Sequence, residues 1–182
     1  IYTHSSGLNI IPASLSLEDL VGVEIDNLSE YIRNLNSEFV ILDSAPGFGK
    51  EAVSALKACN EAIIVSTPTV PSIMDAIRGK KVLQELKIPY IGLVLNKVMG
   101  KKYELSRKEI YQLTELPVLA EIPFDEKFVE SLAMKVPLVL YEKRSAATLQ
   151  FLEMASILTG EDYEIPRVGL LNRFFGFFKR FS

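Results

Sequence analysis

The chain has 182 residues, which is enough for one sizeable core and too few for two. Of these residues, 48% are hydrophobic and 24% are charged, which is an ordinary globular composition. The formal net charge is −3. The chain has a single cysteine, Cys59, which excludes an intramolecular disulfide, and we predict that Cys59 is buried as a small hydrophobic residue. The sequence shows neither a signal peptide nor a membrane span, which indicates the cytosol. Because it begins at Ile1 and not at methionine, we expect the C-terminal part of a longer protein.

Apolar, β-branched runs alternate with helical patterns along the chain. We predict strands at residues 8–11, 39–43, 62–66, 90–96, 118–122 and 138–140, and helices at 17–35, 50–59, 72–86, 105–113, 126–134 and 146–158. The central strands are apolar throughout, as is typical of strands covered on both faces. This alternation predicts an α/β fold, a doubly wound and mostly parallel sheet with helices on both faces, whose ligands bind at the carboxyl ends of the strands.

An aspartate and two glycines follow the predicted strand 39–43. Asp43 ends the run FVILD, where a rigidly held carboxylate suits Mg²⁺ bound through water. Gly47 and Gly49 would let backbone N–H groups approach an anion such as a terminal phosphate. The simpler alternative is that Asp43 caps the next helix. The segment is not a P-loop, because Ser44 and Glu51 stand where that motif requires glycine and serine or threonine, and no other segment fits it.

Two further strand ends carry candidate binding residues. Asn96 ends the run YIGLVLN, and its amide can offer both a donor and an acceptor to a purine edge. Position 99 is methionine, where guanine-binding proteins have aspartate, so adenine is favoured over guanine. Pro123 and Asp125 follow the strand 118–122, where a base could lean on the backbone. In isolation, the better interpretation of Asp125 is the N-cap of the next helix.

The last sixteen residues form an unusual segment, which we call the tail (residues 167–182). On a helix, its polar and basic residues, including Arg173, Lys179 and Arg180, lie on one side. The opposite half of the circumference is apolar and comprises Leu170, Leu171, Phe174, Phe175, Phe177, Phe178 and Phe181. This pattern predicts a helix that lies in the interface of an anionic membrane. The alternative is a terminal helix docked on the protein's own core.

The charge distribution supports a separate role for the tail. The tail holds four of the 20 basic residues and no acidic one, which leaves 16 basic against 23 acidic residues, or −7, in the rest of the chain. An acidic body argues against general nucleic-acid binding. Gly160 and Pro166 mark a break before the tail. We therefore divide the chain into a domain at 1–159, a linker at 160–166 and the amphipathic helix at 167–182.

Taken in order, these motifs resemble the MinD branch of the ParA/MinD superfamily of deviant-Walker P-loop ATPases. The resemblance covers essentially the whole chain and includes the tail, which selects the MinD branch. Its segments are LNIIPASLSLE, FVILDSAPGFGKEA, VSTPTVPSIMDAIR, GLVLNKV and IPFDEKFVESLAMKVPLVLY. The fold that the resemblance implies is an incomplete P-loop NTPase fold.

The resemblance also implies roles for individual residues. Asp43 resembles the Walker B aspartate that organises Mg²⁺ through water, and Gly47 belongs to the switch II segment that senses the γ-phosphate. Asn96, Pro123 and Asp125 resemble adenine-contacting positions. Asp75 and Arg78 lie on a helix that contributes to partner binding in the family, which is a looser transfer. The implied ligands are ATP and Mg²⁺.

The resemblance implies a protein that switches between membrane-bound and free states and helps to position cellular structures such as the division site. It implies an ATP-dependent homodimer, a MinC-like regulatory partner, no specific nucleic acid, and a cytoplasmic location at the inner face of the cell membrane. Family members begin with a P-loop and a switch I segment, on the order of 80 residues that this sequence lacks, and phosphoryl transfer requires that cradle together with a lysine and a metal. We therefore expect no ATP hydrolysis by these residues alone.

Three other functions remain open from the sequence. A ParA-like DNA-segregation ATPase would need a basic patch on the acidic body. An iron–sulfur carrier of the same superfamily would need paired cysteines, and Cys59 stands alone. A non-catalytic interaction module is favoured by the absence of a P-loop motif.

Overall fold

The computed structural model describes residues 1–4, 6–12 and 28–161. These residues divide into two compact units, Ile1–Cys59 and the unit that begins at Asn60. The tail and most of the predicted helix 17–35 lie outside the described residues. None of the helices described is both long and apolar enough to cross a bilayer.

In the first unit, the described residues form one two-stranded sheet and two short helices. Its strands β1 (Tyr2–Thr3) and β2 (Asn9–Ile10) form an antiparallel hairpin, in which Tyr2 pairs with Ile10. Its helices are α2 (Leu28–Arg33) and α3 (Lys50–Lys57). The predicted strand at 8–11 is therefore reduced to the two residues of β2.

The predicted strand at residues 39–43 is not formed. The run FVILD is irregular, and Ile41 has 90% of its surface exposed. An extended segment becomes a strand only when a neighbour accepts and donates its backbone hydrogen bonds, and the described residues provide none for this run. Apolar character alone was not sufficient for this prediction.

The second unit contains a parallel three-stranded sheet in the order β3–β4–β5. Its strands are β3 (Ala62–Ser66), β4 (Tyr90–Val98) and β5 (Val118–Pro123), each close to the predicted bounds. Its helices are α4 (Val70–Glu85), α5 (Arg107–Thr114), α6 (Glu126–Ala133), α7 (Leu138–Tyr141) and α8 (Ala146–Thr159).

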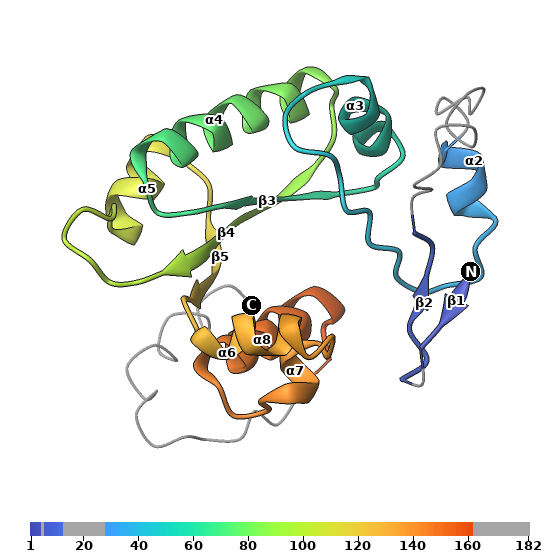
Figure 1. The fold of residues 1–182 in the computed structure, drawn as a ribbon. Coiled ribbons are helices and arrows are strands. Elements are labelled where there is room, and N and C mark those ends of the chain that lie inside the picture. Colours follow the sequence, from blue (N-terminus) through green and yellow to red (C-terminus); the bar gives the residue numbers. More distant parts are fainter. Residues whose placement is uncertain (5, 13–27, 162–182) are drawn as a thin grey trace. The chain divides into compact units, whose positions relative to one another are not determined.

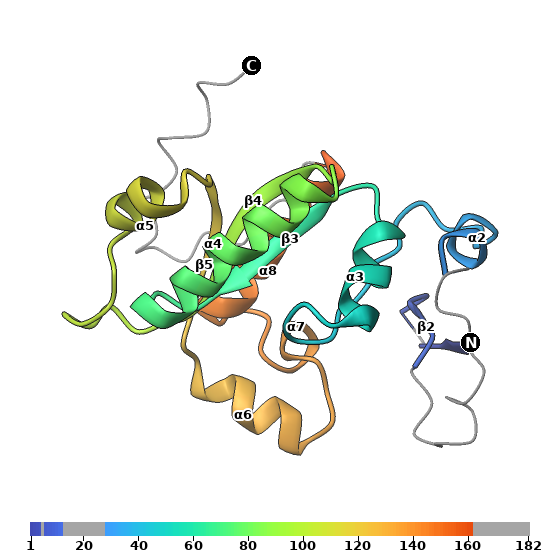
Figure 2. The ribbon, with the colours of Figure 1, turned by 90° about the horizontal axis from the view of Figure 1, so that it is seen from above.

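Helices cover both faces of this sheet (Figure 1, Figure 2). Successive residues of β4 point to opposite faces, so Leu93 and Leu95 pack with α4 and α5 in one core, whereas Val94 packs with α7 and α8 in the other. The predicted doubly wound α/β arrangement with a parallel sheet is thereby confirmed for the second unit.

The predicted strand at 138–140 is wrong, because this run forms the helical turn α7. The backbone N–H groups of Leu140 and Tyr141 both donate to the carbonyl oxygen of Pro137, at 2.9 and 3.0 Å. A three-residue apolar run cannot distinguish a strand from a buried helical turn by its pattern. Its environment decided the outcome, since Leu138 packs in the core beside α8.

Gly92 lies where strand β4 comes close to the start of β5 and to the residue before it. A Cβ atom at this position would lie 2.5 Å from the carbonyl oxygen of Pro117 and 2.9 Å from Cγ of Leu119. We expect Gly92→Ala to lower the free energy of unfolding by about 2 kcal/mol or more, because the two strands must move apart. Urea denaturation measures this change.

A matched variant for that measurement is Gly49→Ala. A Cβ atom at Gly49 would meet only a side-chain oxygen of Glu51, at 3.4 Å. We expect a small effect there. Equal losses of stability for the two variants would show that the Gly92 contact is not what constrains the sheet.

Candidate functional site

The carboxyl ends of β3, β4 and β5 lie at one edge of the parallel sheet (Figure 1). Two contacts join the ends of β4 and β5: Val98 is the register partner of Pro123, and the N–H of Phe124 donates to the carbonyl oxygen of Val98 at 2.9 Å. The structure therefore brings Asn96 and Pro123, two predicted site residues, to adjacent strand ends. This edge is where doubly wound sheets bind their ligands.

Asn96 sits where β4 departs from regular geometry. Its Oδ1 accepts a hydrogen bond from the N–H of Lys97 at 2.9 Å. Lys97 has a φ of 57°, and the β4–β5 register shifts between Leu95 and Val98. A non-glycine residue in this left-handed conformation costs on the order of 1–3 kcal/mol and is found preferentially at functional sites. The local hydrogen bond engages the amide oxygen, while the NH₂ group carries the two donors that could reach a base.

Asp125 has a structural role in the described chain. Its Oδ1 accepts a hydrogen bond from the N–H of Lys127 at 2.9 Å, which makes it the N-cap of α6. This is the interpretation that the sequence favours in isolation. Pro123, in contrast, is the half-buried last residue of β5 and caps no helix.

A carboxylate that the sequence analysis did not single out organises the loop after β4. Glu104 accepts hydrogen bonds from the N–H groups of Met99 and Lys101, each at 3.0 Å. Desolvation raises the pKa of the Glu104 carboxyl, but these backbone donors, with Gly100, outweigh it and hold the pKa below its ordinary value. In the sequence, the glycine at position 100 is the only signal of this turn. In the structure, Gly100 has a φ of 69°.

Hydroxyl groups also gather where β3 leads into α4. The side chains of Thr67 and Thr69 both donate to Oγ of Ser72, at 2.8 and 3.0 Å. The sequence marked Ser72 only as a helix start. These hydrogen bonds connect the loop after β3 to the first turn of α4, at the candidate edge.

Asp43 and Gly47 belong to the first unit, whereas Asn96, Pro123 and Asp125 belong to the second. Asp43 is exposed in an irregular segment, and Gly47 has a φ of 85°. This positive φ is a conformation that glycine adopts without steric cost. The Mg²⁺ role of Asp43 and the phosphate role of Gly47 stay predictions.

The two predicted partner residues pair with each other on α4. Nη1 of Arg78 lies 2.7 Å from Oδ1 of Asp75, and both side chains are about two-thirds exposed, at 68% and 67%. An exposed pair at this spacing contributes little to stability. Its accessibility is compatible with a partner surface, and that role stays a prediction.

Cys59 fits a structural role. Its Sγ donates to the carbonyl oxygen of Ala55 at 3.2 Å, and desolvation raises the pKa of the thiol. Within the described residues, no three His, Cys, Asp or Glu side chains gather as a metal-binding group.

Comparisons with known proteins point to one superfamily. Residues 20–159 match the ParA family model, described as the NUBPL iron-transfer P-loop NTPase. An uncharacterised ATP-binding protein of Methanocaldococcus jannaschii is 34% identical over 88% of this chain and 62% of its own length. The septum site-determining protein MinD of Synechocystis is 29% identical over 85% of this chain and 60% of its own length.

Solved structures agree with these relatives. The cell-division ATPase MinD of Pyrococcus furiosus superimposes with a TM-score of 0.75 at 24% identity, covering 81% of this chain and 63% of that one. The chain thus spans about three-fifths of the length of the relatives and structures that it matches. On its motifs, its parallel sheet and the match over residues 20–159, the chain belongs to the ParA family of P-loop NTPases, and MinD proteins are among its relatives.

Proposed function

We propose that this chain is the adenine-binding and switch portion of a MinD-like ATPase that acts as an ATP-dependent membrane switch. The observation that carries the proposal is the juxtaposition of Asn96 and Pro123 at adjacent strand ends of a MinD-type sheet. Several MinD relatives are named for determining the septum site, which supports a role in spatial positioning.

The described residues fit ATP and Mg²⁺ as ligands. The Asn96 amide can donate to a purine edge, and the donor-free Pro123 leaves space for a flat base against the backbone. A solved MinD structure of Pyrococcus horikoshii is a complex with Mg-ADP. Asp43 is a lone exposed carboxylate, a donor that suits Mg²⁺ held mainly by water and phosphate oxygens.

The tail supplies the membrane half of the proposal. One short amphipathic helix binds a bilayer marginally and reversibly, whereas two linked helices bind far more firmly because the second acts at a high effective concentration. An ATP-dependent homodimer would present two tails together, and hydrolysis would separate them. The protein would then cycle between the cytoplasm and the inner face of the cell membrane.

A regulatory partner is part of the same proposal. A solved structure of the Aquifex aeolicus relative is a MinC:MinD complex. The exposed Asp75–Arg78 pair on α4 is a candidate contact for a MinC-like protein. Specific nucleic acid is not expected as a partner, since the chain outside the tail is acidic.

Nucleotide titration tests the proposal. We compare this chain with a longer form, in which the phosphate-binding half of a MinD domain precedes Ile1. We expect MgATP to bind the longer form at least about tenfold more tightly, because the phosphates then gain their backbone cradle and lysine. In the longer form, Asn96→Ala should weaken binding about tenfold, as expected for losing one or two hydrogen bonds to the base.

Asn60→Ala is the matched control for this titration. Asn60 is an exposed asparagine that precedes β3, at the amino end of the sheet and away from the candidate edge. Calorimetry should show wild-type affinity for this variant. A longer form that binds no MgATP, or an Asn96→Ala variant with unchanged affinity, would contradict the proposed base site.

A further inference from the structure

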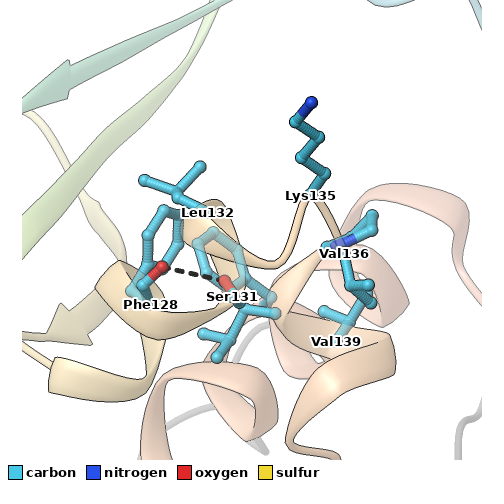
Figure 3. Close-up of a pocket in the computed structure, with 9 residues that line it drawn as sticks. Phe128, Ser131, Leu132, Lys135, Val136 and Val139 are labelled. Carbon is cyan, nitrogen blue, oxygen red and sulfur yellow. Dashed lines mark hydrogen bonds between the residues drawn. The ribbon is translucent and has the colours of Figure 1, made fainter.

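The second unit has an apolar groove whose lining includes none of the candidate site residues. The groove has a volume of about 440 Å³ and lies between α6, the turn that follows it, α7 and the aromatic ring of Phe151 on α8. Figure 3 shows Phe128, Leu132, Val136 and Val139 around it, while the Lys135 side chain extends away from them.

The walls of the groove are apolar and well ordered by local contacts. The rings of Phe128 on α6 and Phe151 on α8 lie with their centroids 6.4 Å apart in a tilted arrangement. The one hydroxyl in the lining, that of Ser131, donates to the carbonyl oxygen of Phe128 at 2.8 Å and is thereby satisfied (Figure 3). The groove therefore favours an apolar occupant without hydrogen-bonding demands.

Part of the groove's apolar lining is open to solvent. Leu132 is 66% exposed and Val136 is 36% exposed, and both line the groove. Adjoining apolar side chains with this exposure are typical of surfaces that bind another segment.

The tail is an apolar segment that lies close to the groove residues in sequence. The tail carries seven leucine and phenylalanine residues on one helical face. It follows α8, the helix that contributes Phe151 to the groove and ends at Thr159. The groove and the tail are thus joined by one short connection.

The connection is long enough for the tail to return to the groove. Phe151 lies ten residues before Glu161, which is about 15 Å along a helix. The nine residues 162–170 can span at most about 30 Å when extended. The apolar face of the tail can therefore reach Phe151 without any change in α8.

We propose that the α6–α7–α8 groove receives the apolar face of the chain's own tail when no membrane is present. The groove is the size of a pocket for a small ligand, so it holds part of the apolar face and leaves the basic side outward. Docking in the groove then competes with insertion into lipid. The membrane consequence rests on the function proposed above, whereas docking itself does not.

A single tryptophan can report on this docking, because the chain contains none. We place Phe174→Trp in the full 182-residue chain and measure quenching of its fluorescence by acrylamide in the absence of lipid. We expect protection in the parent. Leu132→Glu, which puts a charge on the lip of the groove, should raise the quenching constant at least twofold.

Val129→Glu is the matched control. Val129 is on the same helix and is 62% exposed, yet it does not line the groove. We expect it to leave quenching unchanged. Equal quenching in the parent and the Leu132→Glu variant would overturn the proposal, and so would protection that disappears on dilution, because a second copy would then be the occupant.

Vesicle binding separates this proposal from the membrane function. With vesicles of equal parts phosphatidylcholine and phosphatidylglycerol, Leu132→Glu should bind up to about tenfold more tightly than Val129→Glu if nine in ten parent tails are docked. If Leu132→Glu raises quenching but no variant binds vesicles, docking is supported and the membrane switch is wrong. If all variants bind vesicles equally and show equal quenching, the membrane role survives and docking is wrong.

Discussion

Deletion of residues 167–182 is expected to lower the affinity of the ATP-loaded longer form for anionic vesicles by at least about 100-fold. Burying one phenylalanine or leucine side chain contributes about 1.5–3 kcal/mol, and the tail carries seven such residues on one face. Each basic residue near an anionic surface adds about 1 kcal/mol at low salt. Co-sedimentation with vesicles measures the change.

Point variants test the apolar face of the predicted tail helix. Phe177→Asp combined with Phe178→Asp should reproduce most of the loss, because both residues belong to the apolar face predicted from the sequence. Asn172→Ser, on the opposite side, should bind like the parent. Unchanged recruitment after the deletion would contradict the membrane switch, because the tail is the segment to which the proposal assigns membrane binding.

Asp43→Asn is expected to lower ATP hydrolysis by the longer form about 100-fold or more while leaving nucleotide binding largely intact. A carboxylate that organises Mg²⁺ contributes several kcal/mol of charge stabilisation in the transition state, and each 1.4 kcal/mol corresponds to a factor of ten in rate. The asparagine keeps the size of the side chain and removes its charge. A steady-state phosphate-release assay measures kcat.

Glu38→Gln provides the comparison for that variant. Glu38 is an exposed acidic residue that immediately precedes the run FVILD, and it has no assigned role. We expect it to retain wild-type turnover. If Asp43→Asn also retained it, the Walker B assignment would be wrong. The alternative role of Asp43 as a helix cap is not formed in the structure, where the N-cap of α3 is Gly49 and no side chain caps this helix.

The sequence by itself determined most of the second unit. Strand β3 has the predicted bounds, and β4 and β5 differ from prediction only at their ends, because each is an apolar run flanked by turn residues and followed by a periodic helix. The parallel arrangement followed from the same pattern, since fully apolar strands need helices on both faces. Asn96 and Pro123 could be placed at one edge for that reason.

Tertiary structure alone decided the features that depend on neighbours. The runs 39–43 and 138–140 are both apolar, yet the first has no strand partner among the described residues and the second packs as a helical turn beside α8. The groove lined by Phe128 and Phe151 likewise joins residues that no local pattern connects. Periodicity records which faces of an element are apolar, whereas hydrogen-bond partners and grooves arise only when distant segments meet.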